Sequence, residues 1–482
     1  MKIFCLNPPY LENYSRTQRS PQVTKSGTFY YPIWLAYAVT AVEASGHRVR
    51  LVDALADRRS LDWCLESAKR DEPDLIVIDT STPSIENDAS VARQLKELIP
   101  ESLVCLVGPH VSATANETLR AYPWVDFVTI GEYDHSLRDI ADSLQSGSSN
   151  DWKNVAGIAH LEGDEVKTNP RQAWIQDLDS IPFVSSTYLR HLDFQNYFYA
   201  ITQWPVVTII SGRGCPYKCN YCMYPQVLHG HQYRTRSPEN VAAEMSFIEK
   251  SFLGVKEIFI EDDTLTLHRK RVVALCEEII RLGLKINWTC NARADVDLDT
   301  LKIMKAANCR LLCVGIESGD QRILDEVGKG IQLQQVEQFF EDVKQAGVMV
   351  HGCFMAGNRG ETRETMEKTL GLAKRLNPDT AQFYPLMVYP GTKAYEWARS
   401  EGLIKARTWK EWLTEDGHHS TVVDRPDLPH DEVVKFCDRA RREFYLRPSY
   451  LVHKMRQLVR HPKEIRRVVR GFKTLAKYLF RK

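Results

Sequence analysis

The stretch that decides the fold is "SGRGCPYKCNYCMYP" at residues 211–225, which holds three cysteines within eight positions, Cys215, Cys219 and Cys222. Thiolate sulfur is the soft ligand that iron–sulfur clusters and zinc prefer. A structural zinc ion and a usual [4Fe–4S] cluster both take four protein ligands, and the next cysteine, Cys276, falls on a predicted helix far along the chain. Three thiolates leave one iron of a cluster open to another molecule. The spacing therefore predicts a catalytic cluster rather than a structural metal.

The cysteine motif follows the first of six apolar, strand-like runs, which lie at 206–214, 257–263, 286–293, 311–319, 348–357 and 381–392. Helical patterns separate these runs, for example at 238–252 and 362–376. Strands that alternate with helices predict a parallel sheet, and six such units predict a partial (β/α)6 barrel of the TIM type. In such barrels the functional groups lie at the carboxyl ends of the strands.

Polar or glycine residues stand at the carboxyl ends of these runs, at Glu261, Asp262, Asn291, Arg293, Glu317, Ser318 and Gly357. A helix cap or a turn explains any one of them. Several strand ends in succession favour a binding site at this rim, because the carboxyl ends of parallel strands meet at one edge.

The first 145 residues contain five more strand-like runs, "KIFCLNPP", "RVRLVDA", "DLIVIDTST", "LVCLVGPH" and "FVTIGE", with helical segments such as 33–45 and 88–98 between them. This alternation predicts an open, doubly wound parallel sheet, whose ligands sit beyond the carboxyl ends of the strands. The candidate residues there are Asn7, Pro8, Thr80, Ser81, Thr82, Gly108, His110, Gly131 and Glu132. Such residues suit a large planar or phosphate-bearing ligand, but βα turns use them in any case.

A polar segment at 145–151 marks a boundary, and a hairpin that turns at 162–164 follows it. We divide the chain into an α/β domain (1–145), a hairpin and linker (146–200), the barrel (201–420) and a basic helical region (421–482). From Arg447 to the end there are twelve Lys or Arg residues and one acidic residue. Apolar residues recur there at helical spacing, opposite a basic face, at Ile465, Val468, Phe472, Leu475 and Leu479. This composition is typical of a helix that binds a membrane surface, and a helix packed on the barrel explains it equally well.

Composition excludes several classes of function. The net charge of the 482 residues is only +1, which argues against a nucleic-acid partner. No apolar run approaches the roughly 20 residues of a membrane span. Twelve cysteines without a secretion signal indicate reduced thiols. We expect a cytoplasmic protein, in peripheral contact with the inner face of the membrane if 447–482 is the membrane-binding segment.

The pattern C-x3-C-x-aromatic-C, with Tyr221 as the aromatic residue, resembles the signature of radical S-adenosylmethionine (SAM) enzymes. The resemblance implies a [4Fe–4S] cluster on the three cysteines, whose open iron binds SAM and whose electron yields a 5′-deoxyadenosyl radical. It also implies SAM contacts from Tyr221 and from the rim residues named above. In "FMAGNRGET", Asn358 and Arg359 replace the Leu-Pro of the family's usual loop.

The segments "LNPP", "GPHV", "FVTIGE" and "LDSIPF" resemble the cobalamin-binding members of that superfamily, over roughly residues 1–420. The resemblance implies cobalamin contacts at the strand ends of the first domain. The D-x-H-x-x-G motif, whose histidine ligates cobalt in other cobalamin domains, is absent. The lower ligand of cobalt is therefore left open.

The commonest reaction of the family implies methylation of an unactivated carbon through methylcobalamin, on a lipid-linked or other natural-product-type small molecule. It also implies an external electron donor of the flavodoxin or ferredoxin type. Relatives with this domain order also suggest a cyclase or a rearrangement enzyme acting on porphyrins or lipids.

Two further alternatives are a tRNA methylthiotransferase and a cobalamin or iron–sulfur sensor without turnover. The tRNA enzyme needs three more cluster cysteines, whereas Cys5, Cys64 and Cys105 have the pattern of core residues. Among the cysteines of the barrel, Cys290, Cys309, Cys313 and Cys353, we expect most to be buried in the core. Cys290 and Cys353 stand near enough to strand ends to line a cavity.

Overall fold

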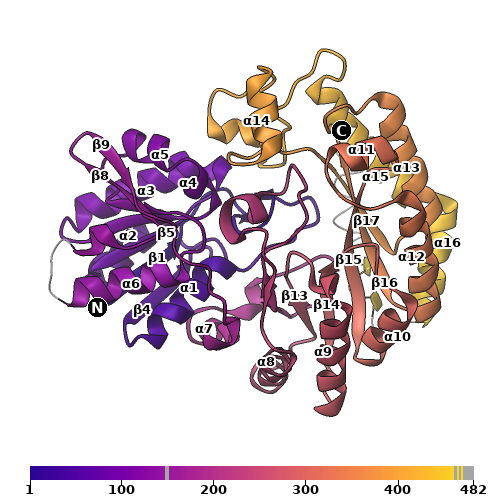
Figure 1. The fold of residues 1–482 in the computed structure, drawn as a ribbon, viewed down its shortest axis with the longest axis horizontal. Helices are drawn as coiled ribbons and strands as arrows, with labels where there is room; N and C mark the ends of the chain where they lie inside the picture. Colours follow the sequence, from indigo (N-terminus) through magenta and orange to yellow (C-terminus); the bar gives the residue numbers. More distant parts are fainter. Residues whose placement is uncertain (147–150, 461–463, 466–467, 470–482) are drawn as a thin grey trace.

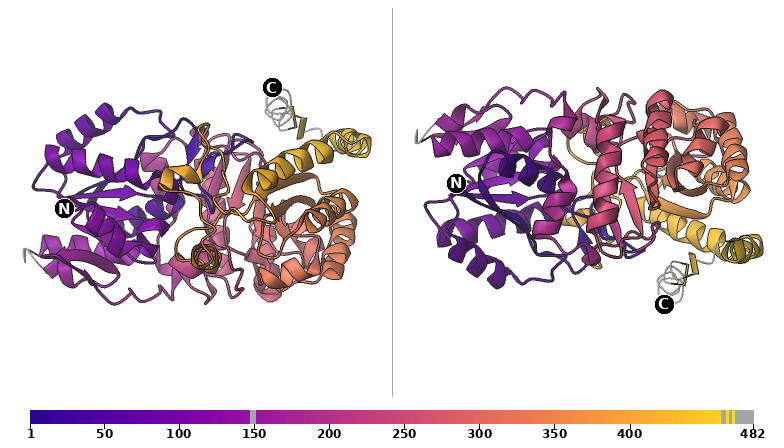
Figure 2. Two further views of the ribbon diagram at one scale, coloured as in Figure 1. Left: turned by 90° about the horizontal axis from the view of Figure 1, so that it is seen from above. Right: turned by 90° about the horizontal axis from the view of Figure 1, so that it is seen from below.

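The computed structural model describes residues 1–146, 151–460, 464–465 and 468–469. Two parallel sheets, each with its own helices, lie next to one another (Figure 1), and the second sheet is the predicted barrel. α15 (His430–Tyr445) packs against the last barrel strand, and α16 (Pro448–Arg460) follows it. α16 lies at the end of the molecule farthest from the first sheet (Figure 2).

The first sheet has seven strands in the order β4-β1-β5-β6-β7-β8-β9. Its five parallel strands are those that the sequence predicts, β1 (Lys2–Asn7), β4 (Arg48–Asp53), β5 (Leu75–Asp79), β6 (Leu103–Val107) and β7 (Phe127–Thr129). The predicted hairpin is also present, as β8 (Ile158–Glu162) and β9 (Glu165–Thr168), and it extends this sheet in antiparallel fashion. The chain order reverses between β1 and β5, so a ligand crevice is expected at their carboxyl ends.

Helices cover both faces of this sheet, which confirms the doubly wound fold. On one face, Ile3 and Cys5 of β1 share a core with α1 (Ile33–Ala44) and α6 (Asp134–Gln145). On the other face, Phe4 and Leu6 pack with α2 (Leu61–Asp71), α3 (Ile85–Leu98) and α5 (Ala115–Ala121). Successive side chains of a strand point to opposite faces, so one apolar run feeds both cores. The thiols of Cys5, Cys64 and Cys105 are buried in these cores, as expected.

The second sheet contains six parallel strands in sequence order, β10 (Val206–Ile209), β13 (Glu257–Ile260), β14 (Asn287–Ala292), β15 (Cys309–Glu317), β16 (Met349–Ala356) and β17 (Thr380–Pro385). The connecting helices are α8 (Pro238–Ser251), α9 (Arg269–Arg281), α10 (Leu298–Ala306), α11 (Gln321–Glu326), α12 (Leu333–Ala346) and α13 (Arg363–Leu376). In the described chain β10 and β17 do not pair, so the sheet is a partial barrel, as predicted.

A long connection between β1 and α1, residues 8–32, leaves the first sheet at its switch point and reaches the barrel. We call it the strap; it contains the short strands β2 (Tyr14–Ser15) and β3 (Gln22–Val23). The Val23 amide donates to the carbonyl oxygen of Gly417 at 2.7 Å. Arg19 of the strap contacts the carboxyl end of β13, as described below. The strap therefore joins the crevice of one sheet to the rim of the other.

The C-terminal part begins with α14 (Lys393–Ser400), which lies over the junction of the two sheets in Figure 1. Within the described residues, no helix is both long enough and apolar enough to cross a membrane. Much of the predicted basic amphipathic helix, including Phe472, Leu475 and Leu479, lies outside the described residues.

Candidate functional site

The three motif cysteines lie on an excursion of the chain directly after β10. β11 (Gly212–Arg213) pairs antiparallel with β12 (Arg234–Thr235), and this pair closes the base of the loop 214–233. Gly214 has a φ of +85°, and a Cβ there would overlap the carbonyl oxygen of Gln232. Only glycine allows the chain to turn so tightly here. The glycine directly before Cys215 is thus a requirement of the loop's geometry.

The cysteine turn is held from behind by amide groups. Gln226 Nε2 donates to the carbonyl oxygens of Cys219 at 3.2 Å and Cys222 at 2.8 Å. The Asn220 amide donates to the carbonyl oxygen of Val327 at 2.9 Å. All three thiols are free and partly exposed. Burial raises the pKa of Cys215 to about 11, so a metal cluster must displace protons when it binds.

The donor set fits an iron–sulfur cluster. Three unpaired thiols stand on one turn, and all three line a cavity of about 540 Å³ in the barrel. Carbonyl groups of this turn are already satisfied by Gln226, so the thiols are the groups left for a metal. Tyr221 lines the same cavity.

Five side chains from the ends of β13, β14 and β15 also line the cavity: Glu261, Asp263, Asn291, Arg293 and Glu317. The sequence predicts all of these except Asp263 as cofactor contacts. Arg19 of the strap pairs with Glu261 at 2.7 Å and with Asp263 at 3.1 Å. The guanidinium group of Arg19, which belongs to the α/β domain, therefore pairs with the acidic residues at the carboxyl ends of the barrel strands.

Glu261 carries an unused acceptor at this rim. Its Oε2 is buried and has no hydrogen-bond partner in the described chain, although Oε1 accepts from Arg19. Burial raises the pKa of Glu261 to about 7, against the lowering effect of Arg19. A buried carboxylate needs a further partner to keep its charge. The ammonium group of SAM is a partner of the right charge, so the rim fits SAM.

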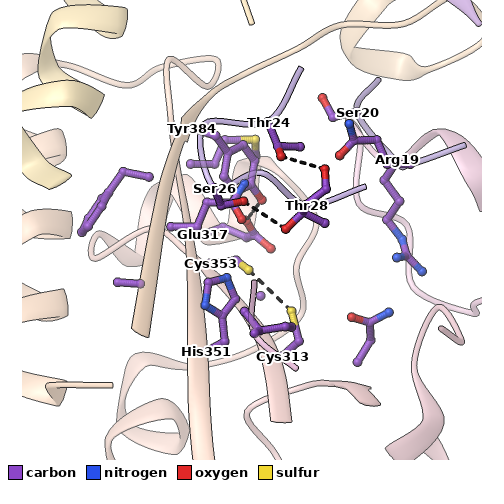
Figure 3. A pocket seen from close by; sticks show the side chains of 18 of the residues that line it. Arg19, Ser20, Thr24, Ser26, Thr28, Cys313, Glu317, His351, Cys353 and Tyr384 are labelled. Carbon is purple, nitrogen blue, oxygen red and sulfur yellow. Dashed lines mark hydrogen bonds between the residues drawn. The ribbon is translucent and has the colours of Figure 1, made fainter. Parts of the chain in front are cut away.

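Glu317 is aimed by a distortion of the sheet. The register between β15 and β16 shifts between Gly315 and Glu317, and Glu317 has a φ of +67°. Its carboxylate accepts from Lys329 Nζ at 2.9 Å and from the Tyr384 hydroxyl at 2.8 Å. Bulges and left-handed residues of this kind re-aim side chains at functional sites. The carboxylate lies in the cavity (Figure 3).

Three predicted cofactor residues lie behind the rim rather than in the cavity. Asp262 accepts from the amides of Ser211 at 2.6 Å and Gly212 at 3.0 Å, and so braces the base of the cysteine loop. The Ser318 hydroxyl lies 3.3 Å from the Thr369 hydroxyl, and the Gly357 amide donates to Glu361 at 2.7 Å. These residues position the site without lining its cavity.

At the carboxyl edge of the first sheet, the predicted side chains are tied to one another. Asn7 Nδ2 donates to Asp53 at 2.8 Å, and the Pro8 carbonyl oxygen accepts from Arg16 of the strap at 3.0 Å. The Thr80 hydroxyl donates to the Val107 carbonyl oxygen at 2.7 Å. Internal hydrogen bonds therefore use these polar groups.

The middle of the same edge is covered from outside. The Ser81 hydroxyl lies 2.7 Å from the Tyr14 hydroxyl, and Thr82 lies 3.1 Å from His110 Nδ1. The ring of Trp409 packs edge-on against His110, with centroids 4.9 Å apart. Burial lowers the pKa of His110 to about 3, so its imidazole is neutral.

Position 108 requires glycine, because its φ is +115° and a Cβ there would lie 2.7 Å from the Thr80 carbonyl oxygen. The polar side chains of this edge are thus bound to other groups of the protein, and none of the residues predicted here lines the cavity of the barrel.

Glu132, the last predicted residue of this edge, lies in a buried ion cluster between the two units, next to the tip glycine Gly131. Its carboxylate contacts Arg213 at 3.6 Å, Arg234 at 3.0 Å and His229 Nδ1 at 3.0 Å. Burial alone would raise the pKa of Glu132, but the Arg213 guanidinium and the hydrogen bonds with His229 and Arg234 hold it well below its usual range. Arg213 also pairs with Asp134 at 2.8 Å. Because Arg213 directly precedes the cysteine loop, this cluster fixes the loop to the first sheet.

Sequence reasoning missed the strap, and it favoured core packing over a place in the cavity for Cys313 and His351. Arg19, Ser20, Thr24 and Thr28 line the cavity although they belong to the first unit, and Cys313 and His351 line it from mid-strand. A signal for the strap was present, because 8–32 is too long and too polar for an ordinary βα turn.

The family models match both halves of the chain. The Radical SAM superfamily model matches residues 209–373, and the B12 binding domain model matches residues 20–141. An uncharacterized methyltransferase of Pyrococcus horikoshii is 32% identical over 446 residues, which cover 92% of this chain and 94% of the relative.

Two further comparisons extend this result. An anaerobic magnesium-protoporphyrin IX monomethyl ester cyclase of Cereibacter sphaeroides is 27% identical, over 77% of this chain and 60% of the relative. The solved structure of the radical SAM methyltransferase TsrM from Kitasatospora setae, with cobalamin and a [4Fe–4S] cluster bound, superposes with a TM-score of 0.71. That likeness covers 93% of this chain and 89% of the other at 15% identity, and it shows the shared fold.

Proposed function

Because the chain belongs to the cobalamin-binding family of radical SAM enzymes, we propose that it methylates an unactivated carbon of an apolar, lipid-type small molecule. The observation that carries this proposal is the cavity. It begins at the three cysteines, passes the acidic rim and continues through the barrel to Leu451 and Lys454 of α16. Apolar side chains from β13, β16 and β17 form part of its wall, including Phe259, Met355 and Phe383, which favours an apolar substrate.

The chain's residues divide among the three cofactors of the family. Cys215, Cys219 and Cys222 would hold the cluster, and Glu261, Asn291, Arg293 and Glu317 would hold SAM. Cobalamin would sit beyond the carboxyl edge of the first sheet, where the strand order reverses. When bound, the cluster and SAM supply a 5′-deoxyadenosyl radical and cobalamin supplies a methyl group.

The protein's own task is to position the substrate and to exclude water. Apolar side chains line the middle of the cavity, including Tyr199, Phe259, Met355 and Phe383. The strap forms part of the cavity wall, where Arg19 is anchored to both Glu261 and Asp263. A substrate held between these walls keeps one orientation, which lowers the entropic part of the barrier.

The far end of the cavity supports delivery of the substrate from a membrane surface. Leu451, Val452, Met455 and Val459 of α16 expose 40%, 41%, 59% and 81% of their surface, and basic residues lie among them. Exposed apolar side chains beside an exposed arginine, here Arg456, are typical of a helix that lies in a lipid headgroup region. We extend the proposal to peripheral membrane contact through this helix, and to an electron donor of the flavodoxin or ferredoxin type.

Methylation is tested with SAM that carries a deuterated methyl group. The anaerobic enzyme with cluster, cobalamin and reductant is incubated with a lipid extract of the source organism. We expect S-adenosylhomocysteine and 5′-deoxyadenosine in similar amounts, with the label in the lipid fraction and none in a Cys222→Ala control. Production of 5′-deoxyadenosine without S-adenosylhomocysteine would contradict methylation and favour a cyclase.

A further inference from the structure

Three metal-ligating side chains that the cofactors above do not use meet on the wall of the cavity. Cys313 comes from β15, and His351 and Cys353 come from β16. One sulfur atom from each cysteine and one ring nitrogen of the histidine all lie within 4.8 Å of one another. All three side chains line the cavity (Figure 3).

The register of the two strands explains this meeting. Cys313 pairs directly with His351 across the parallel ladder, and Cys353 stands two residues further along β16. Side chains two residues apart point to the same face of a sheet, so His351 and Cys353 both point inward. The arrangement is thus built on rigid strands rather than on a loop.

The distance between the two sulfur atoms matches the distance between two thiolate ligands of one zinc ion. Cys313 Sγ lies 3.8 Å from Cys353 Sγ. Two thiolates on a tetrahedral zinc ion, each with a bond of about 2.3 Å, are separated by about 3.8 Å. A disulfide bond would bring the same atoms to about 2.05 Å.

We propose that Cys313, His351 and Cys353 bind a zinc ion, whose fourth coordination position faces the substrate cavity. Two thiolates neutralise the charge of the dication, so the occupied site adds no net charge to a half-buried wall. A sulfur and nitrogen set with three protein ligands is typical of zinc sites that keep one position for an exchangeable ligand. The fourth ligand would be water or an oxygen, nitrogen or sulfur donor of the substrate.

A neighbouring hydroxyl group supports this assignment. The Thr380 hydroxyl lies 2.8 Å from His351 Nδ1, and a hydrogen bond to one ring nitrogen commonly orients a metal-bound histidine. Thiolates are the forms of cysteine that bind zinc, so zinc binding releases the protons of the two thiols.

The site is tested by metal content, which is independent of turnover and hence of the proposed methyl transfer. Zinc and iron are measured by plasma mass spectrometry in the full chain, purified anaerobically with its cluster and equilibrated with one equivalent of zinc. We expect about one zinc per chain, and Cys313→Ser and Cys353→Ser each to lower zinc to background without lowering iron.

The matched control is Cys290→Ser, a barrel cysteine on the adjacent strand β14 that does not line the cavity; it should keep both metals. X-ray absorption at the zinc edge reads the ligands directly, and we expect two sulfur neighbours at about 2.3 Å and one fewer nitrogen in His351→Gln. Zinc at background in the unaltered chain, zinc retained in both serine variants, or a Cys313–Cys353 disulfide in the mass spectrum would each overturn the proposal.

Discussion

The carboxyl edges of the two parallel sheets carry similar sequence signals and have different structures. In the barrel, the side chains of Glu261, Asn291 and Glu317 face a cavity, and Glu261 keeps an acceptor without a partner in the described chain. In the first sheet, Asn7, Thr80 and Ser81 are bound to neighbouring groups of the protein. A polar residue after a buried strand therefore becomes a ligand-binding group only where the following chain leaves it uncovered.

The strap explains much of this difference. It leaves the first sheet at the switch point, and its residues Tyr14 and Arg16 cover the edge of that sheet. Its next residues then line the barrel's cavity. One connection thus covers one edge and completes the other.

The largest effect is expected at the cysteine loop, where the contrast between the two sheet edges predicts that the cluster can be removed without loss of cobalamin. Cys222→Ala should remove the cluster and abolish SAM cleavage, because the two remaining thiolates cannot hold a [4Fe–4S] cluster with an open iron. Iron content and 5′-deoxyadenosine formation measure the result, and cobalamin retention should not change. Cys276→Ala, on α9 and away from the cavity, is the matched control. Loss of cobalamin together with the cluster would show that the two edges do not act separately.

A second large effect is expected at the contact between the sheets. Arg213→Met leaves Asp134 and Glu132 short of a buried cation, and breaking a buried ion pair costs about 3–5 kcal/mol. Denaturant unfolding should show an earlier first transition. The exposed pair of Arg439 with Glu367 is the comparison, since surface pairs contribute about 0–1 kcal/mol. Equal shifts for Arg213→Met and Arg439→Met would remove the special role of the buried cluster.

At the barrel rim, SAM affinity should depend on pH through Glu261. The pKa of this carboxyl is raised to about 7 by burial, so it gains its negative charge, and its attraction for the SAM ammonium, as pH rises through about 7. Binding should tighten over this range in titration calorimetry. Glu261→Gln should weaken binding by about 10-fold or more, as for a lost charged hydrogen bond of about 1.5–3 kcal/mol, and should remove the pH dependence.

The same group gives an opposite dependence for folding. Because the folded pKa lies above the unfolded value of 4.5, the folded protein binds the proton more tightly, and stability without SAM falls as pH rises from about 4.5 to about 7. Glu261→Gln should flatten this part of the stability profile. An unchanged slope would show that the carboxyl is not the titrating group.

At the edge of the first sheet, a substitution should lower stability rather than cofactor binding. Asn7→Ala removes a buried hydrogen bond to Asp53, which costs about 1–2 kcal/mol. Cobalamin retained after gel filtration, measured by absorbance, should stay the same. If cobalamin were lost while the unfolding midpoint held, Asn7 would be a cofactor contact and the contrast between the two edges would fail.

Much of this architecture was predictable from sequence because it follows from local patterns. Alternating apolar runs predict both sheets, and C-x3-C-x2-C predicts the cluster loop. The direction of a side chain at a strand end is not local. Asp262 and Glu261 are neighbours in sequence, yet Asp262 accepts from the backbone of the cysteine loop while Glu261 lines the cavity.

The cavity wall shows the same limit. Cys309 is buried, as its pattern predicts, and Cys290 is buried too although it stands near a strand end. Cys353 lines the cavity, as its place near a strand end predicts, and Cys313 lines it against the core prediction, because the six strands do not close and leave an interior that side chains do not fill. The register that brings them beside His351 depends on pairing between strands, which a single sequence does not state.

The smallest effect is expected at α16, where the comparison extends to the surface of the molecule. If this helix delivers substrate to the cavity, its exposed apolar residues should bind vesicles that contain anionic lipid. Met455 and Val459 expose 59% and 81% of their surface, so replacing both with serine should leave the fold unchanged. If both side chains insert partly into the membrane, they together contribute on the order of 1 kcal/mol to the free energy of vesicle binding. The affinity for vesicles, measured by co-sedimentation, should therefore fall about fivefold in the double variant. Ile280→Ser, at an exposed apolar residue of α9, is the control and should have no effect. Equal binding by all three proteins would show that α16 does not contact the membrane, and the cavity would then take its substrate from solution.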